Sequence, residues 1–216
     1  MPTIDQARAW YADADPVHDF SHILRVLALA ERLAQAEGAD LAIVRAAALL
    51  HDAHGAAPSG GPAAAAERRA SHHLDSAEFA QQVLAAEGWP PERIAAVQHC
   101  IRAHRFRGTE RPETVEAKVL FDSDKLDVLG AIGAARAVAY AALAGQPLTG
   151  EPSARFQATG EKEPGEAHTP YHEFLFKLSK IKDRLHTPAA RALAEARQRY
   201  LGEFFDRLRA ETRGEL

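Results

Sequence analysis

His51 and Asp52 stand next to each other at the end of an apolar run that covers Leu41–Leu50. A histidine also occurs upstream, at His22, and an aspartate downstream, at Asp124. Neighbours on one helical turn point in different directions, so a target shared by His51 and Asp52 needs further ligands from other helices. Imidazole and carboxylate ligands without thiolates suit a divalent ion such as manganese, iron, magnesium, cobalt or catalytic zinc. The four residues therefore predict a metal site that supports chemistry rather than a structural one.

Each of these residues also has an ordinary explanation. The chain contains 11 histidines, so chance His-Asp neighbours are expected, and His18-Asp19 is a second such pair. His22 shares a helical stripe with Val26 and Leu33, which is typical of a hydrogen-bonded core histidine. A buried carboxylate without a cationic partner is costly, however, and a shared divalent ion removes that cost. This argument favours the metal site for the set as a whole.

The candidate ligands lie in three segments whose order and spacing resemble a known family. The segments run from Asp13 to Val26, from Ala47 to His54 and from Phe121 to Asp127. They resemble the H…HD…D pattern of the HD-domain superfamily of metal-dependent phosphohydrolases. Further similar segments are Ser71–Glu78, Ile101–Phe106, Lys177–Leu178, Thr187–Arg191 and Ala194–Arg197. The resemblance therefore covers most of the chain, and it is strongest to the stand-alone bacterial HD hydrolases.

The resemblance implies a set of metal ligands, which are His22, His51, Asp52 and Asp124. Asp122 and Asp127 compete with Asp124 for the last position. The sequence Ser-Asp-Lys-Leu around Asp124 matches the family's pattern of a small residue, Asp, Lys or Arg, and Leu. This match favours Asp124 as the ligand.

His72 and His104 resemble the additional histidines by which some branches of the superfamily hold a second metal ion. Their alternative role is catalytic, as contacts to the substrate phosphate or in proton transfer. An ordinary surface position is a further alternative. The resemblance leaves open whether one or two metal ions bind.

Three basic residues lie close in sequence to the candidate ligands. Lys125 follows Asp124 directly, Arg25 lies three residues after His22, and His18 lies one helical turn before His22. Such groups hold phosphate oxygens, Arg in a bidentate manner and Lys as a point charge. The ordinary alternative for each is a solvated helix face or an ion pair. Lys125 is the best candidate, both for binding the substrate and for neutralising charge on the phosphate during catalysis.

The resemblance implies hydrolysis of a phosphate ester or anhydride by a metal-activated water, and we expect a small-molecule substrate, namely a nucleotide. Covalent catalysis is not expected, because no Gly-x-Ser-x-Gly elbow or glycine-rich phosphate loop occurs. Two alternatives keep the same fold. One is a di-iron oxygenase, which needs His72 and His104 as ligands of a second iron. The other is a non-catalytic module that senses a nucleotide.

Composition limits the class of protein. The chain has 216 residues, is 46% hydrophobic and carries a formal net charge of -4, so it lacks the basic footprint of a nucleic-acid binder or a membrane-surface protein. Its single cysteine, Cys100, excludes an internal disulfide and fits a reducing compartment. No secretory signal and no run of about 20 apolar residues is present. We expect a cytoplasmic protein, and its oligomeric state stays open.

Nearly every periodic segment has helical spacing, and no alternating strand pattern occurs. The sequence therefore predicts an all-α fold, a single compact multi-helix bundle over residues 1–216 with the metal site at its centre. The metal-binding core is expected over about 15–144, a polar linker over 145–169 and C-terminal helices over 170–212.

Boundary signals divide the helical pattern. Gly38 is placed to end the stripe that begins near Ile23, and Asp40 can cap the next helix. Further helices are expected over 71–88, 91–104, 114–144, 171–185 and 188–212. The segment 145–169 is expected to be slack surface chain.

Overall fold

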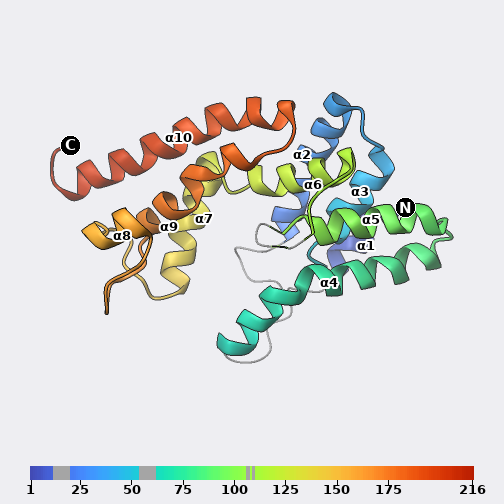
Figure 1. Ribbon diagram of the computed structural model, residues 1–216, viewed down its shortest axis with the longest axis horizontal. Helices are drawn as coiled ribbons and strands as arrows, with labels where there is room; N and C mark the ends of the chain where they lie inside the picture. Colours follow the sequence, from blue (N-terminus) through green and yellow to red (C-terminus); the bar gives the residue numbers. More distant parts are fainter. Residues whose placement is uncertain (12–19, 54–61, 106–107, 109) are drawn as a thin grey trace. The chain divides into compact units, whose positions relative to one another are not determined.

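The computed structural model describes residues 1–11, 20–53, 62–105, 108 and 110–216, with the backbone alone for residues 62–71. Within these ranges every regular element is helical (Figure 1). The prediction of an all-α fold is therefore confirmed. His18, one of the predicted substrate contacts, lies outside the described residues.

The described elements follow one another along the chain without any strand between them. They are α1 (Ile4–Ala9), α2 (Phe20–Glu37), α3 (Leu41–Leu50), α4 (Pro62–Ala86), α5 (Pro91–Ala103), α6 (Val115–Leu126), α7 (Gly130–Leu143), α8 (Ala154–Thr159), α9 (Pro170–Phe176), two 3₁₀ turns, η1 (Leu178–Lys180) and η2 (Lys182–Arg184), and α10 (Pro188–Thr212).

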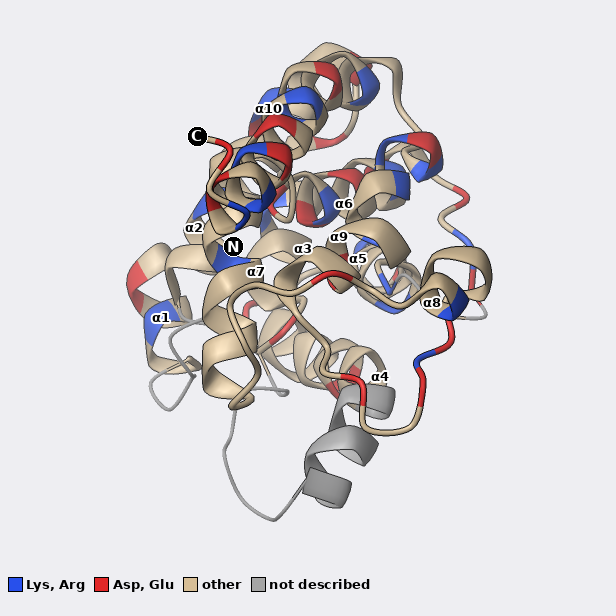
Figure 2. Cartoon of the chain, turned by 90° about the vertical axis from the view of Figure 1, so that its left-hand side faces the viewer, with Lys and Arg blue, Asp and Glu red and all other residues tan. Residues whose placement is uncertain are grey.

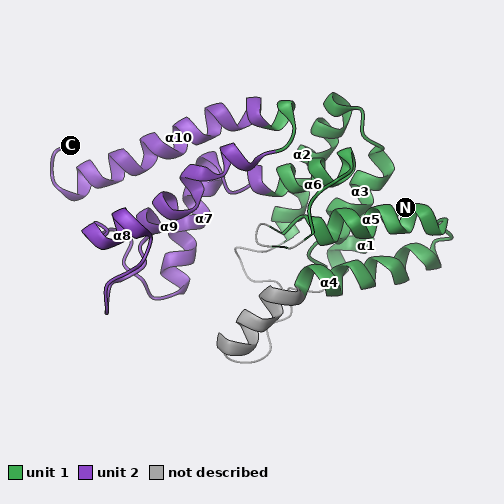
Figure 3. Cartoon of the chain, viewed as in Figure 1, with its two compact units in different colours: residues 1–124, 186–190 green, residues 125–185, 191–216 purple. Residues whose placement is uncertain are grey.

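The chain divides into two compact units (Figure 3). Unit 1 comprises residues 1–124 and 186–190, and unit 2 comprises residues 125–185 and 191–216. The boundary between the units falls within α6, after Asp124, and within α10, after Ala190. Each of these two helices therefore contributes residues to both units. All the candidate metal ligands belong to unit 1. The single domain over the whole chain stays a prediction.

Helices α2 and α3 pack against each other in unit 1. On α2 the buried side chains recur at spacings of three and four residues, which turns one face inward. Gly38, with φ at +69°, follows the end of α2. The carboxylate of Asp40 accepts the backbone N–H of Ala42 at 2.9 Å and so caps α3. Both boundaries confirm the sequence prediction, and the apolar α3 carries His51 into the interior.

Helices α4 and α5 lie side by side (Figure 1). Helix α5 begins at Pro91, as predicted, because proline fits the first helical turn. The predicted start of α4 at Ser71 is wrong, since the helix already begins at Pro62. The alanines that follow Pro62 are strong helix formers, and they extend the helix toward the N-terminus.

The prediction of one helix over residues 114–144 is wrong, because the chain breaks between α6 and α7. Gly130 adopts a φ of +71°, and Leu129 before it is extended. The guanidinium of Arg197 donates to the backbone oxygen of Leu126 at 2.7 Å, which satisfies a carbonyl at the end of α6.

In the described part of the chain no single helix is long and apolar enough to cross a bilayer. By length and composition alone, only the bent pair α6 and α7 passes that test.

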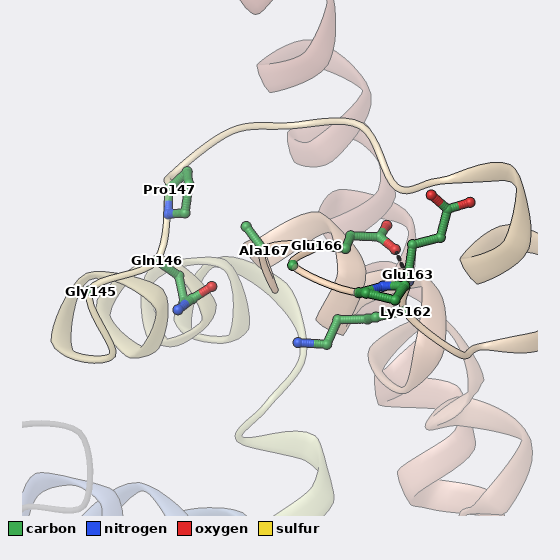
Figure 4. Close-up of a pocket in the computed structure, with 9 residues that line it drawn as sticks. Gly145, Gln146, Pro147, Lys162, Glu163, Glu166 and Ala167 are labelled. Carbon is green, nitrogen blue, oxygen red and sulfur yellow. Dashed lines mark hydrogen bonds between the residues drawn. The ribbon is translucent and has the colours of Figure 1, made fainter.

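The polar segment 145–169 in unit 2 is organised around one carboxylate. Glu166 accepts hydrogen bonds from the backbone N–H groups of Ser153 and Glu163, each at 2.7 Å, and the ring of His172 lies 3.0 Å from it. Figure 4 shows the hydrogen bond between Glu163 and Glu166. These hydrogen bonds, that from Ser153 above all, lower the pKa of Glu166 to about 2. The segment lines an open pocket and contains α8, so it is an ordered loop rather than the expected slack chain.

Aromatic side chains hold α9 against α10 in unit 2. The ring of Phe174 stacks on that of Phe205 with 4.8 Å between their centroids, and Phe205 is fully buried. Basic and acidic residues are interleaved along α10 (Figure 2). The predicted helix over 188–212 is confirmed, whereas the one predicted over 171–185 ends at Phe176 and gives way to the two 3₁₀ turns.

Candidate metal centre

Four side chains from α2, the end of α3 and α6 converge in unit 1. The Nε2 atom of His22 lies 3.5 Å from Oδ1 of Asp124 and 3.8 Å from Oδ2 of Asp52. The Nε2 atom of His51 lies 3.4 Å from the same Oδ2 of Asp52. The structure therefore brings together the four residues that the sequence predicts as metal ligands.

Two further histidines approach the other oxygen of the same carboxylate. The Nε2 atoms of His72, on α4, and His104, at the C-cap of α5, each lie 3.5 Å from Oδ1 of Asp52. Asp52 consequently belongs to two groups of three possible ligands. One contains His22 and His51, and the other contains His72 and His104; within each group the ligand atoms lie within 4.8 Å of one another.

Backbone hydrogen bonds fix the orientation of two of these imidazole rings. The Nδ1 atom of His51 lies 2.9 Å from the backbone oxygen of Ala48, and that of His104 lies 2.5 Å from the backbone oxygen of Ile101. Because a carbonyl only accepts, Nδ1 carries the hydrogen in both rings and donates it. The lone pair of each ring therefore sits on Nε2, the atom that faces Asp52. Histidines that bind metals are commonly held in this way.

Two buried atoms of the cluster have no hydrogen-bond partner among the described residues, namely Nε2 of His51 and Oδ1 of Asp52. An acceptor left in this state costs free energy, and native structures seldom retain one without a reason. A divalent cation bound between the imidazoles and the carboxylate would satisfy both atoms. The donor set of nitrogens and oxygens also matches divalent transition metals, so the residues fit a metal ion.

The protonation states of the cluster suit metal binding. Burial lowers the pKa of His51 to about 4, so its ring is neutral at pH 7. Burial alone would raise the pKa of Asp52, but His51, His104 and His72 together hold it well below its usual range. A neutral imidazole and an ionised carboxylate are the forms that coordinate metals.

The arrangement of these residues agrees with a family match. The HD domain family matches residues 19–129, a stretch that contains all six residues of the cluster. The chain belongs to the HD-domain family. The YpgQ protein of Bacillus subtilis (strain 168) is 30% identical to this HD-domain protein over 218 residues, covering 97% of this chain and 94% of YpgQ. An HD domain implies the binding of divalent metal.

Solved structures show the same fold. The crystal structure of Bacillus subtilis YpgQ in complex with ADP superposes on this HD-domain protein with a TM-score of 0.69 at 30% identity, covering 95% of this chain and 96% of that one. An HD-superfamily hydrolase from Bacillus thuringiensis gives a TM-score of 0.70 at 27% identity, covering 97% and 94% of the two chains. The protein thus has the fold of the HD-superfamily hydrolases.

The competitors of Asp124 in this HD-domain protein have other partners. Asp122 is fully buried and accepts the backbone N–H groups of His186 and Thr187, at 2.9 and 2.7 Å. Asp127, also buried, pairs with the guanidinium of Arg136 at 2.6 Å. Asp124, like these two, lies outside the two described groups of three possible ligands, but its Oδ1 atom lies 3.5 Å from Nε2 of His22.

The predicted substrate contacts are less closely tied to the cluster. Arg25 is half-buried on α2, and its guanidinium donates to the hydroxyl of Ser21 at 2.7 Å. Lys125 is half-buried, follows Asp124 on α6 and is the first residue of unit 2. Both remain predictions as substrate contacts.

The sequence gives no signal for two residues that lie beside the cluster. The ring of His73 lies next to that of His72, with 5.7 Å between centroids, and its Nδ1 atom is buried without a hydrogen-bond partner in the part of the chain that the structure describes. Tyr11 is buried and hydrogen-bonds to the end of α3. A histidine pair and an N-terminal tyrosine have no distinctive spacing, so only the folded chain identifies them.

Proposed function

We propose that this HD-domain protein is a metal-dependent phosphohydrolase that cleaves a phosphate ester or anhydride of a nucleotide. The observation that supports it best is the shared carboxylate of Asp52, whose two oxygens each face two imidazole nitrogens. Two buried atoms of this cluster, Nε2 of His51 and Oδ1 of Asp52, have no hydrogen-bond partner among the described residues, and a bound cation would satisfy both.

The cluster offers places for one or two divalent ions. His22, His51, Asp52 and Asp124 would hold the first, and His72 and His104 would hold a second together with Asp52. When bound, such ions supply Lewis acidity that generates a nucleophilic hydroxide from water near neutral pH and polarises a phosphoryl oxygen. Manganese, iron, magnesium, cobalt and zinc all remain candidates for this donor set.

The protein's own residues have distinct tasks in this proposal. The carbonyls of Ala48 and Ile101 hold the rings of His51 and His104, so the geometry of the site is fixed before the substrate arrives. Lys125 and Arg25 would hold the non-bridging oxygens of the phosphate and neutralise the charge that develops there. His18 is proposed as a further contact to the substrate.

The proposed substrate class rests on a relative. YpgQ, which shares 30% of its residues with this chain, has been crystallised in complex with ADP. A nucleoside diphosphate presents the anionic oxygens that a metal cluster and cationic side chains bind. A nucleoside di- or triphosphate is therefore the first class of compound to test.

One observation favours a second candidate function, a di-iron oxygenase. That chemistry needs His72 and His104 as ligands of a second iron, and both rings lie 3.5 Å from Oδ1 of Asp52. Oxygen uptake by protein reconstituted with iron, measured beside phosphate release, separates the two reactions. A nucleotide-sensing module would show a third result, in which nucleotide binds but neither phosphate release nor oxygen uptake occurs.

The experiment that tests the proposal begins with the metal content of protein purified without added ions. Phosphate release is then screened across nucleoside mono-, di- and triphosphates with manganese, magnesium, iron and cobalt. We expect release from at least one nucleotide with at least one ion. Absence of release across the whole panel by metal-loaded protein contradicts the proposal.

A further inference from the structure

Tyr11 contacts the chain segment that carries His51 and Asp52. Its ring is buried, with 4% of the residue exposed, and its hydroxyl donates to the backbone oxygen of Leu49 at 3.0 Å. Leu49 lies two residues before His51 and three before Asp52. The phenol group is therefore anchored to the backbone immediately before the His51-Asp52 pair.

The end of α3 needs such a partner. The last carbonyl groups of a helix have no N–H within the helix to accept. Here the chain passes from Leu50 into a turn in which the N–H of Ala53 bonds to the oxygen of Leu50, at 3.2 Å, and not to that of Leu49. The carbonyl of Leu49 takes the hydroxyl of Tyr11 instead, which fixes the path of the backbone at Asp52.

The short N-terminal segment also touches the helices that carry other ligands. The ring of Tyr11 packs on Phe20, the first residue of α2, with 5.6 Å between centroids. The edge of Trp10 meets Phe79 on α4 at 5.4 Å, and the N-terminal amino group pairs with Glu87 near the end of the same helix at 2.6 Å. Residues 1–11 thus connect α2, α3 and α4, which present His22, His51 and His72.

We propose that Tyr11 is a positioning residue that sets the direction of the Asp52 carboxylate within the metal cluster. The inference rests on the proposed metal site and extends it to a residue that touches neither metal nor substrate. Asp52 serves both ligand groups, so a small shift of its backbone changes both at once.

A plain packing role is the competing explanation, and Tyr11→Phe separates the two. This variant keeps the ring against Phe20 and removes only the hydroxyl. Loss of a group that orients metal ligands costs on the order of 10–100-fold in metal affinity or activity. We expect Co²⁺ to bind Tyr11→Phe about 10-fold or more weakly, with an altered visible absorption spectrum of the bound cobalt.

Two variants serve as controls. Phe20→Leu weakens the packing around Tyr11 but keeps the hydroxyl, so it should lower the unfolding midpoint while leaving the cobalt spectrum unchanged. Tyr200→Phe changes a tyrosine on α10 that is 49% exposed and should leave both the spectrum and the midpoint unchanged.

The outcomes distinguish this inference from the proposed function. An unchanged cobalt affinity and spectrum in Tyr11→Phe overturns the positioning role, whatever happens to stability. A weakened, altered cobalt site in Tyr11→Phe supports it even if the wild-type protein hydrolyses no nucleotide, in which case the proposed function alone fails. Wild-type protein that binds no cobalt overturns the inference as well, whereas the proposed function then depends on the phosphate-release screen with the other ions.

Discussion

The Nε2 atom of His104 lies 3.5 Å from Oδ1 of Asp52, while the Nε2 atom of His51 lies 3.4 Å from Oδ2. Asp52 stands next to His51 in the sequence, but His104 comes from a helix more than fifty residues later. The carboxylate is thereby common to two sets of ligands. If two ions bind, Asp52 would be a ligand of both, whereas His51 and His104 would each serve one.

Removing Asp52 should abolish binding at both sites, whereas removing His104 should affect only one. We expect Asp52→Asn to lose all bound metal and His104→Ala to keep about half of the wild-type content, if both sites are filled. Loss of a group that only orients a ligand costs up to about 100-fold in activity. Asp52 is itself a proposed ligand, so the activity of Asp52→Asn should fall by at least about 100-fold. Elemental analysis of the purified variants measures the stoichiometry.

His99→Ala provides a matched control on the same helix as His104. The ring of His99 bonds to Glu110 at 2.7 Å, and His99 belongs to neither ligand group. Its metal content should equal that of the wild type. Equal metal loss in His99→Ala and His104→Ala would show that His104 acts through the stability of α5 and not as a ligand.

Lys125 and Asp124 are neighbours with different predicted roles. A lysine ammonium is repelled by a metal ion, so its loss should spare metal binding. Since a hydrogen bond to a charged group contributes about 1.5–3 kcal/mol, Lys125→Ala should lower kcat/KM by roughly one to two decades. Asp124→Ala should lose both metal and activity. Complete metal loss in Lys125→Ala, or full activity, contradicts the phosphate contact.

Asp122 should matter for stability and not for metal binding. Besides two backbone N–H groups it accepts the hydroxyl of Thr187 at 2.7 Å, so two buried donors of Thr187 and the part-buried N–H of His186 lose their partner in Asp122→Ala. At about 1–3 kcal/mol for each buried unsatisfied group, the free energy of unfolding should fall by at least about 2 kcal/mol. Urea unfolding measures this loss, and the exposed Asp206→Ala should show almost none. Loss of metal from Asp122→Ala that is still folded would contradict the assignment of Asp124, and not Asp122, as the metal ligand.

Two glycines make a matched pair for the break between α6 and α7. A Cβ added at Gly133 would lie 2.1 Å from the backbone oxygen of Val128, whereas one at Gly202 on α10 meets nothing within 4 Å. Gly133→Ala should therefore destabilise the protein by about 1–3 kcal/mol, and Gly202→Ala should stabilise it by about 0.5–1 kcal/mol. The unfolding midpoint should fall in Gly133→Ala and rise in Gly202→Ala. Similar shifts in the two variants would contradict the close approach of Gly133 to Val128 at the break between α6 and α7.

Local signals in the sequence account for much of the fold. Gly38, Asp40 and Pro91 mark helix boundaries through their own chemistry, so these were predictable. The break after α6 was not, because the apolar spacing through Leu126 and Leu129 continues the helical pattern. The interaction that ends α6 comes from Arg197, 71 residues away.

Contacts between residues distant in the sequence also limit how much of the candidate site can be predicted. The order of His22, the His51-Asp52 pair and Asp124 indicates four ligand candidates through family resemblance. That His72 and His104 face the second oxygen of Asp52 depends on how α4 and α5 pack, which no local pattern encodes. The hydrogen bond from Tyr11 to Leu49 likewise joins residues 38 positions apart.

We propose that this cluster holds the divalent metal needed for nucleotide hydrolysis. The most direct test is phosphate release from nucleoside di- and triphosphates by chelator-stripped protein, before and after addition of Mn²⁺, with Asp52→Asn treated in the same way. The proposed function predicts no release before addition, restored release after it, and none from Asp52→Asn under either condition. Equal release with and without metal, or a fully active Asp52→Asn, would contradict it.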